Sequence, residues 1–115
     1  MKRKIKKNYK RLSRFDKSLI MGLIIDTIKK NKALKRSEIH QYVEKNDDYK
    51  DLVKNLGFVG SELLKKQYES LIDNNLGKLI KRGIVEININ KNYTLSSHGD
   101  EMWVKYNKDW YLLAR

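Results

Sequence analysis

The segment 78-KLIKRGIVEININKNYTLSSHG-99 changes its hydrophobic pattern partway along its length. Up to Arg82 the apolar residues recur at helical spacing, whereas after Gly83 they alternate with polar residues. A glycine directly after a periodic stretch favours the left-handed conformation that ends a helix. A short polar turn follows, and its asparagines tolerate a positive φ. The pattern predicts a helix that ends at Gly83 and runs directly into a hairpin with strands over 84–89 and 93–95.

Helical spacing predicts further helices on both sides of this hairpin. We expect them over 16–31, 37–45, 61–82 and from 97 onwards, with one more helical turn over 52–56. Ser37 and Ser61 are the expected N-caps. Gly77 lies inside the longest helix, where it costs about 1 kcal/mol, and it predicts a bend or a close contact. The expected fold class is mainly α with a small β-hairpin (α+β).

The length of 115 residues suffices for one domain with a modest core. Its net charge is +12, and residues 1–17 contribute nine lysines and arginines against one aspartate. We therefore divide the chain into a basic N-terminal arm (1–15), a domain (16–96) and a C-terminal helix (97–115). Phosphate backbones and anionic lipid are the partners that such an arm suits, and a solubilising tail is the alternative.

Several function classes lack support in the sequence. Cysteine is absent, which excludes disulfides and thiolate metal sites. His40 and His98 stand alone, and the segment 57-GFVG-60 lacks the lysine of a phosphate-binding loop. The longest apolar run, 19–25, is too short to span a bilayer, and no cleavage site follows it. We expect no catalysis, cofactor, metal or small-molecule substrate, no membrane partner, and a cytoplasmic, nucleoid-associated location.

The segment 76-LGKLIKRGIVEININKNYTLSSHGDEM-102 resembles the second half of a winged helix-turn-helix domain of small archaeal, phage and plasmid DNA-binding proteins. The resemblance covers about residues 17–100. The matching positions are Leu76, Leu79, Gly83, Ile84, Tyr93, Leu95, Ser96 and Gly99. One departure is the connection over 46–60, which is longer than the three or four residues of a tight helix-turn-helix.

The resemblance implies double-stranded DNA as the partner, with the 61–82 helix in a major groove and the hairpin at neighbouring phosphates or the minor groove. The expected DNA contacts are Lys66, Gln67, Ser70, Asn74, Lys78 and Lys81 on the helix, Lys91 on the hairpin, and Lys2, Arg3, Lys4, Lys6, Lys7, Lys10 and Arg11 in the arm.

A non-enzymatic transcriptional regulator is the leading interpretation of this sequence. A nucleoid-associated or plasmid-partition protein, a protein-interaction winged helix and an RNA-binding protein are the alternatives. A protein-docking helix should expose apolar residues, whereas this one places Lys, Asn, Gln and Ser on its outer face. That difference favours nucleic acid.

The sequence also predicts a homodimer. The first helix offers more apolar surface than one small core usually covers, and the last helix adds aromatic residues at helical spacing. The expected interface residues are Met21, Ile25, Trp103, Tyr106, Trp110 and Leu113. The alternative is a monomer in which the last helix folds back across the first.

Overall fold

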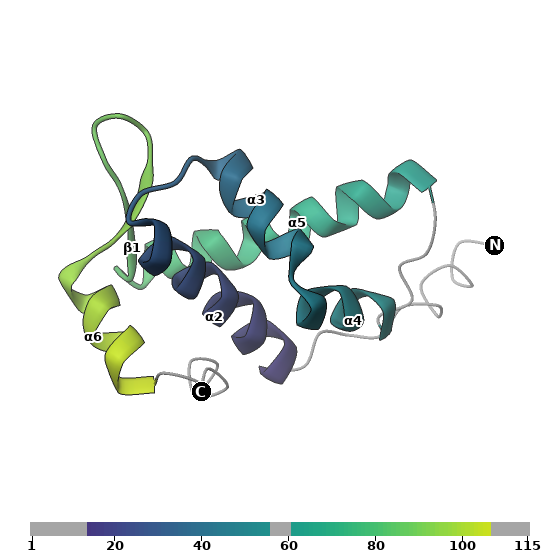
Figure 1. The fold of residues 1–115 in the computed structure, drawn as a ribbon, viewed down its shortest axis with the longest axis horizontal. Helices are drawn as coiled ribbons and strands as arrows, with labels where there is room; N and C mark the ends of the chain where they lie inside the picture. The colour runs from purple at the N-terminus through teal and green to yellow at the C-terminus, as the bar shows by residue number, and fades with distance from the viewer. Residues whose placement is uncertain (1–13, 56–60, 107–115) are drawn as a thin grey trace.

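The computed structural model describes residues 14–55 and 61–106, with their side chains over 16–54 and 70–105. This stretch of the chain is mainly helical and carries one small antiparallel sheet, which confirms the α+β class (Figure 1). The elements are α2 (Arg14–Asn31), α3 (Arg36–Lys45), α4 (Asp47–Asn55), α5 (Ser61–Lys81), β1 (Val85–Ile87), β2 (Tyr93–Leu95) and α6 (Ser97–Tyr106). None of the helices in these ranges is both long and apolar enough to cross a membrane.

Helix α2 lies at the centre of the fold. It contacts α3, α4 and α5, and also β2 and α6, so its apolar residues are covered on several sides. Met21 and Ile25 are only 2% and 0% exposed and belong to the core of the single chain. The prediction that these two residues form a dimer interface is therefore wrong. The broad apolar face of α2 is explained by the number of elements packed around it.

Three helix starts differ from those predicted, and the first is that of α2, which begins at Arg14 rather than at residue 16. Helix α3 begins at Arg36, and Lys35 rather than Ser37 occupies the N-cap position. There the Lys35 backbone N–H donates to the Glu38 carboxylate over 2.8 Å, which satisfies one of the free donors of the first turn.

A full helix, α4, replaces the single turn expected over 52–56. The Asn46 side-chain oxygen accepts from the backbone N–H groups of Asp48 and Tyr49, at 2.9 and 3.2 Å, and thereby caps this helix. Tyr49 and Val53 are fully buried and fix α4 against the rest of the core.

The junction between α5 and β1 matches the prediction. Gly83 has a φ of +72°, and its N–H donates to the Ile80 carbonyl over 3.0 Å. The next N–H, that of Ile84, donates to the Leu79 carbonyl over 2.9 Å. These two bonds form a Schellman motif, which ends the helix and sets the direction of the chain. Leu79 and Ile84 are both buried, so packing fixes the same exit angle.

The hairpin is shorter than predicted, because β1 covers only Val85–Ile87. Val85 pairs with Leu95 and Ile87 pairs with Tyr93. On the other side of β2, Tyr93 exchanges two backbone hydrogen bonds with Leu34, at 2.7 and 3.1 Å. The hairpin is thus tied to the connection between α2 and α3, and Figure 1 shows it projecting from the helices.

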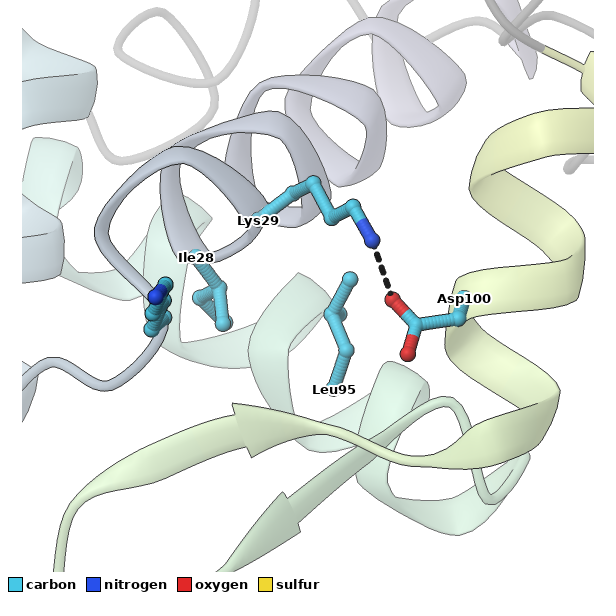
Figure 2. A pocket seen from close by; sticks show the side chains of 5 residues that line it. Ile28, Lys29, Leu95 and Asp100 are labelled. Carbon is cyan, nitrogen blue, oxygen red and sulfur yellow. Dashed lines mark hydrogen bonds and ion pairs between the residues drawn. The ribbon is translucent and has the colours of Figure 1, made fainter.

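Helix α6 packs back onto α2 over its described residues. Lys29 of α2 pairs with Asp100 of α6 over 2.8 Å, beside Ile28 and Leu95 (Figure 2). The Trp103 indole N–H donates to the Asp26 carboxylate over 3.0 Å, and the Lys29 ammonium lies 5.3 Å from the centre of the Trp103 ring. Trp103 therefore makes its polar contacts within one chain, as in the fold-back alternative.

Candidate nucleic-acid interface

The exposed face of α5 carries the predicted DNA-binding residues that the structure describes. From residue 70 onwards, the exposed residues of α5 are Ser70, Asn74, Lys78 and Lys81. Ile72, Leu76 and Leu79 are buried on the opposite side, in contact with the core that α2 organises. The helical spacing therefore separates a core face from a face of small polar and basic residues. Lys66 and Gln67 lie outside the described side chains.

A shallow hollow of about 380 Å³ lies along this face of α5, lined by Asp73, Asn74, Gly77, Lys78 and Lys81. Gly77 forms a section of its wall. A Cβ atom built on Gly77 would meet no atom within 4 Å among the described residues. The close contact predicted at Gly77 is therefore not made within the described ranges, and the space next to the glycine is open.

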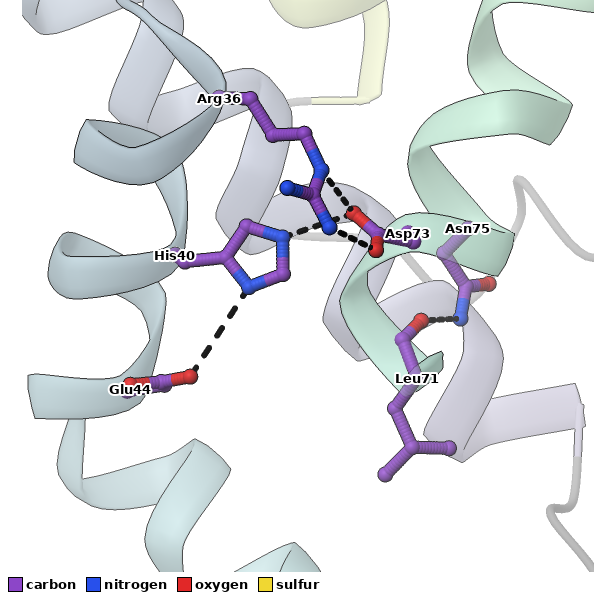
Figure 3. A network of polar contacts seen from close by, with 6 residues as sticks. All are labelled: Arg36, His40, Glu44, Leu71, Asp73 and Asn75. Carbon is purple, nitrogen blue, oxygen red and sulfur yellow. Dashed lines mark hydrogen bonds and ion pairs between the residues drawn. The ribbon is translucent and has the colours of Figure 1, made fainter. Parts of the chain in front are cut away.

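Asp73 is the acidic residue at the edge of the hollow, and α3 neutralises it. Arg36 donates from Nε to Asp73 Oδ1 over 2.9 Å and from its terminal nitrogen to Oδ2, and His40 Nε2 lies 2.7 Å from Oδ1 (Figure 3). Burial alone would raise the pKa of Asp73, but the hydrogen bonds and positive charges of these two partners outweigh it and lower that pKa.

The sequence did not reveal this cluster, and His40 was expected to stand alone. His40 is in fact only 7% exposed, and it lies between Asp73 and Glu44. The Glu44 carboxylate is 3.9 Å from His40 Nδ1. The available signal was the spacing of Arg36 and His40, four residues apart on one face of α3. The cluster holds α3 against α5 and leaves the hollow with a basic character.

The tip of the hairpin is a three-residue loop between Asn88 and Asn92. The Asn88 N–H donates to the Asn92 carbonyl over 2.8 Å, and the Lys91 N–H donates to the Asn88 carbonyl over 2.9 Å. Lys91 has a φ of +64°. The expectation that an asparagine would take the left-handed position is wrong, because the loop closes as a turn followed by a left-handed residue at Lys91. Lys91 is exposed at this tip.

The remaining predicted residues lie outside the described ranges of the chain. This applies to the arm residues Lys2, Arg3, Lys4, Lys6, Lys7, Lys10 and Arg11, and to the side chains of Tyr106, Trp110 and Leu113. Among the described residues, no group of three or more His, Asp or Glu side chains could hold a metal ion.

Comparison with protein-family models, curated proteins and solved structures found no match to this chain. Its function is therefore inferred from its own residues.

Proposed function

We propose that this chain is a non-enzymatic protein that binds double-stranded DNA as a winged helix-turn-helix and regulates transcription. In this proposal α5 enters the major groove, and the hairpin and the basic arm contact phosphates or the minor groove. The observation that carries the proposal is the exposed face of α5. Every exposed residue of α5 from position 70 onwards is polar or basic, and the hollow among them is open.

The chemistry of this face suits base edges and phosphates. The Asn74 amide can form two hydrogen bonds to an adenine edge, and a lysine such as Lys78 or Lys81 can reach guanine or a phosphate. Asp73 would repel phosphates if it were free, but Arg36 and His40 already occupy its carboxylate. From residue 70 onwards, the face therefore offers donors to an anionic partner, and its one acidic residue there is already paired.

The junction at Gly83 supports the use of α5 and the hairpin together. The Schellman motif and the two bonds to Leu34 fix the hairpin relative to the end of α5. A rigid junction of this kind lets two contact elements bind one duplex without losing conformational freedom on binding.

The alternatives make different demands on the same face. A protein-docking helix should present large apolar residues, and the exposed residues of α5 from position 70 onwards include none. Duplex RNA has a deep, narrow major groove that a helix does not enter. A nucleoid-associated or partition protein would use the same contacts, and it differs in the preference for one sequence over random DNA.

A mobility-shift titration tests the proposal. Wild-type protein is titrated into random DNA duplexes, into a duplex selected from them by binding, and into double-stranded RNA, each at two salt concentrations. We expect DNA affinity to fall steeply with salt, by about 0.9 in log K per log unit of salt for each phosphate neutralised. Removal of residues 1–14 should weaken binding to all sequences and reduce this slope.

Point variants separate sequence reading from general attraction. Asn74→Ala should reduce the preference for the selected duplex by about 1–3 kcal/mol, whereas Lys91→Ala should weaken the selected and random duplexes alike. Lys30→Ala is the matched control, because it removes one exposed lysine from α2, which packs on the buried side of α5. Equal losses from Asn74→Ala on both duplexes would show that α5 does not read sequence. No DNA binding by the wild type would refute the proposed function.

The homodimer is a second proposal, and fewer residues now support it. Burial of Met21 and Ile25 removes these two residues of α2 from the interface, which leaves Trp103, Tyr106, Trp110 and Leu113 as its candidates. Two copies would present two α5 helices to half-sites about 34 Å apart. In sedimentation equilibrium, a mass near twice 13.7 kDa that falls in Trp110→Ala would support the dimer, and a wild-type mass of 13.7 kDa would refute it.

A further inference from the structure

We propose that Ile89, at the tip of the hairpin, is an apolar wedge that inserts between adjacent base pairs of DNA and bends the duplex. This inference rests on the proposed DNA binding. It assigns to the hairpin an action beyond the phosphate contact expected of Lys91.

Ile89 is 95% exposed, more than any other large apolar residue in the described ranges. Ile87, two residues earlier, is 51% exposed, whereas Val85 is buried in the core. The apolar residues of the first strand therefore continue outward from the core to the tip of the hairpin. Isoleucine is disfavoured in tight turns, where polar residues and glycine dominate. Neither the packing nor the turn accounts for its presence at this position.

The loop that carries Ile89 is held by a network of hydrogen bonds. Besides the two backbone bonds that close the loop, the Asn88 side-chain oxygen accepts from the N–H groups of Asn90 and Asn92, at 2.9 and 3.0 Å. The base of the hairpin is fixed in turn by Leu34 and by the end of α5. The exposed isoleucine is thus held by a rigid hairpin, and a side chain that inserts between base pairs needs such a rigid backbone.

The charges and polar groups at the tip favour DNA over other partners. From Ile87 to Gly99 the chain contains no acidic residue, and the loop together with Asn88 and Asn92, which close it, combines one lysine with three asparagines. An anionic backbone is complementary to this composition. Ile89 and the half-exposed Ile87 together are too small a patch for a stable protein interface or a membrane anchor. One apolar side chain is, however, enough to separate adjacent base pairs, as in proteins that bend DNA through the minor groove.

The test measures bending and binding separately. Wild-type protein is added to a DNA duplex of about 30 bp that carries a fluorophore at each end and flexible TA or CA steps at its centre. Energy transfer between the ends reports the bend, and 2-aminopurine beside the central step reports unstacking. We expect the wild type to increase both signals. Ile89→Ser should abolish both signals and weaken binding by about 10-fold to 100-fold, the effect of no longer burying one isoleucine side chain.

Two further variants complete the experiment. Ile89→Phe keeps a wedge at the tip and should retain the bend. Val104→Ser is the matched control, because Val104 is 70% exposed on α6 and its loss should change neither signal. Wild-type binding without bending or unstacking, or equal bending by Ile89→Ser, would overturn the wedge and leave the proposed function standing. Absence of wild-type binding to any duplex would refute the proposed function itself.

Discussion

Replacement of Gly77 by alanine should stabilise the fold and weaken DNA binding at the same time. Gly77 lies in the interior of α5, before the Schellman motif turns the chain, and it lines the hollow on the exposed face. A glycine in a helix interior loses more conformational freedom on folding than an alanine does. Its presence therefore calls for a reason, and the open space beside it points to a partner that approaches closely.

The size of the stability change follows from the structure. A Cβ at position 77 would meet no atom within 4 Å among the described residues, so the methyl group introduces no clash with them. Gly77→Ala should then gain the full difference in helix propensity, about 0.8–1 kcal/mol. With a typical urea dependence of about 2 kcal/mol per molar, the unfolding midpoint should rise by about 0.5 M with an unchanged slope.

The change in binding has the opposite sign. A methyl group in the hollow would occupy space that the proposed α5–DNA contact uses. Overfilling a close contact costs about 1–3 kcal/mol, which corresponds to about 5-fold to 150-fold weaker binding. Urea denaturation followed by circular dichroism gives the first quantity, and a mobility-shift titration with the selected duplex gives the second.

A matched variant separates these effects. Ser37→Ala also raises helix propensity at an exposed position, but it lies on α3 and outside the hollow. It should be slightly more stable than the wild type and bind DNA equally well. If Gly77→Ala gains stability and keeps full affinity, no partner approaches this glycine, and the reasoning from the hollow fails. If it gains no stability, the space at position 77 is not open in solution.

Three further changes test the junctions of the fold. Gly99→Ala should lower the free energy of unfolding by about 3 kcal/mol, measured by thermal unfolding, because its Cβ would lie 2.2 Å from the Ile84 carbonyl oxygen. If the variant is as stable as the wild type, α6 does not approach the hairpin this closely. Asp73→Asn should be less stable than the wild type at neutral pH. The lowered pKa of Asp73 means that its ionised form stabilises the fold at pH values above 3.8, the ordinary pKa of the group, and that this contribution is lost as the pH falls through the folded-state pKa. The difference in urea stability between Asp73→Asn and the wild type should therefore shrink in acid; a difference that does not depend on pH would contradict this. Lys91→Gly should raise the free energy of unfolding by about 0.5–1 kcal/mol, because glycine adopts the left-handed backbone conformation of this position without strain. The variant should also bind all DNA more weakly, and unchanged binding would exclude Lys91 from the interface.

Sequence patterns within a few residues predicted the ends of elements and the turns that depend only on neighbouring residues. The end of α5 at Gly83 and the hairpin after it depend on one glycine and on alternation within a dozen residues, and both are visible in the sequence. The N-cap at Asn46 is equally local, since an asparagine before two aspartates is a typical helix start, but the predicted helical turn lies later in the chain, over 52–56.

Contacts between distant segments could not be read in the same way. The role of Met21 and Ile25 depends on how many elements surround α2, which periodicity does not reveal. The pairing of Arg36 and His40 with Asp73 joins residues more than thirty positions apart. For the candidate site, the sequence indicated which side of α5 faces solvent, but it showed neither the hollow beside Gly77 nor the exposure of Ile89.

Three residues in the proposed interface conflict with local folding rules, and together they strengthen the case for function. Gly77 weakens a helix, Lys91 occupies a left-handed position that glycine would fill with less strain, and Ile89 exposes an apolar side chain in a turn. Local conflicts that persist in an otherwise consistent fold are expected where a site serves a partner. The conflicts also fall on the two elements that the Gly83 junction connects, the outer face of α5 and the tip of the hairpin. A single bound duplex would account for all three, since it needs close approach at the helix, a cation beside a phosphate and a wedge at the tip.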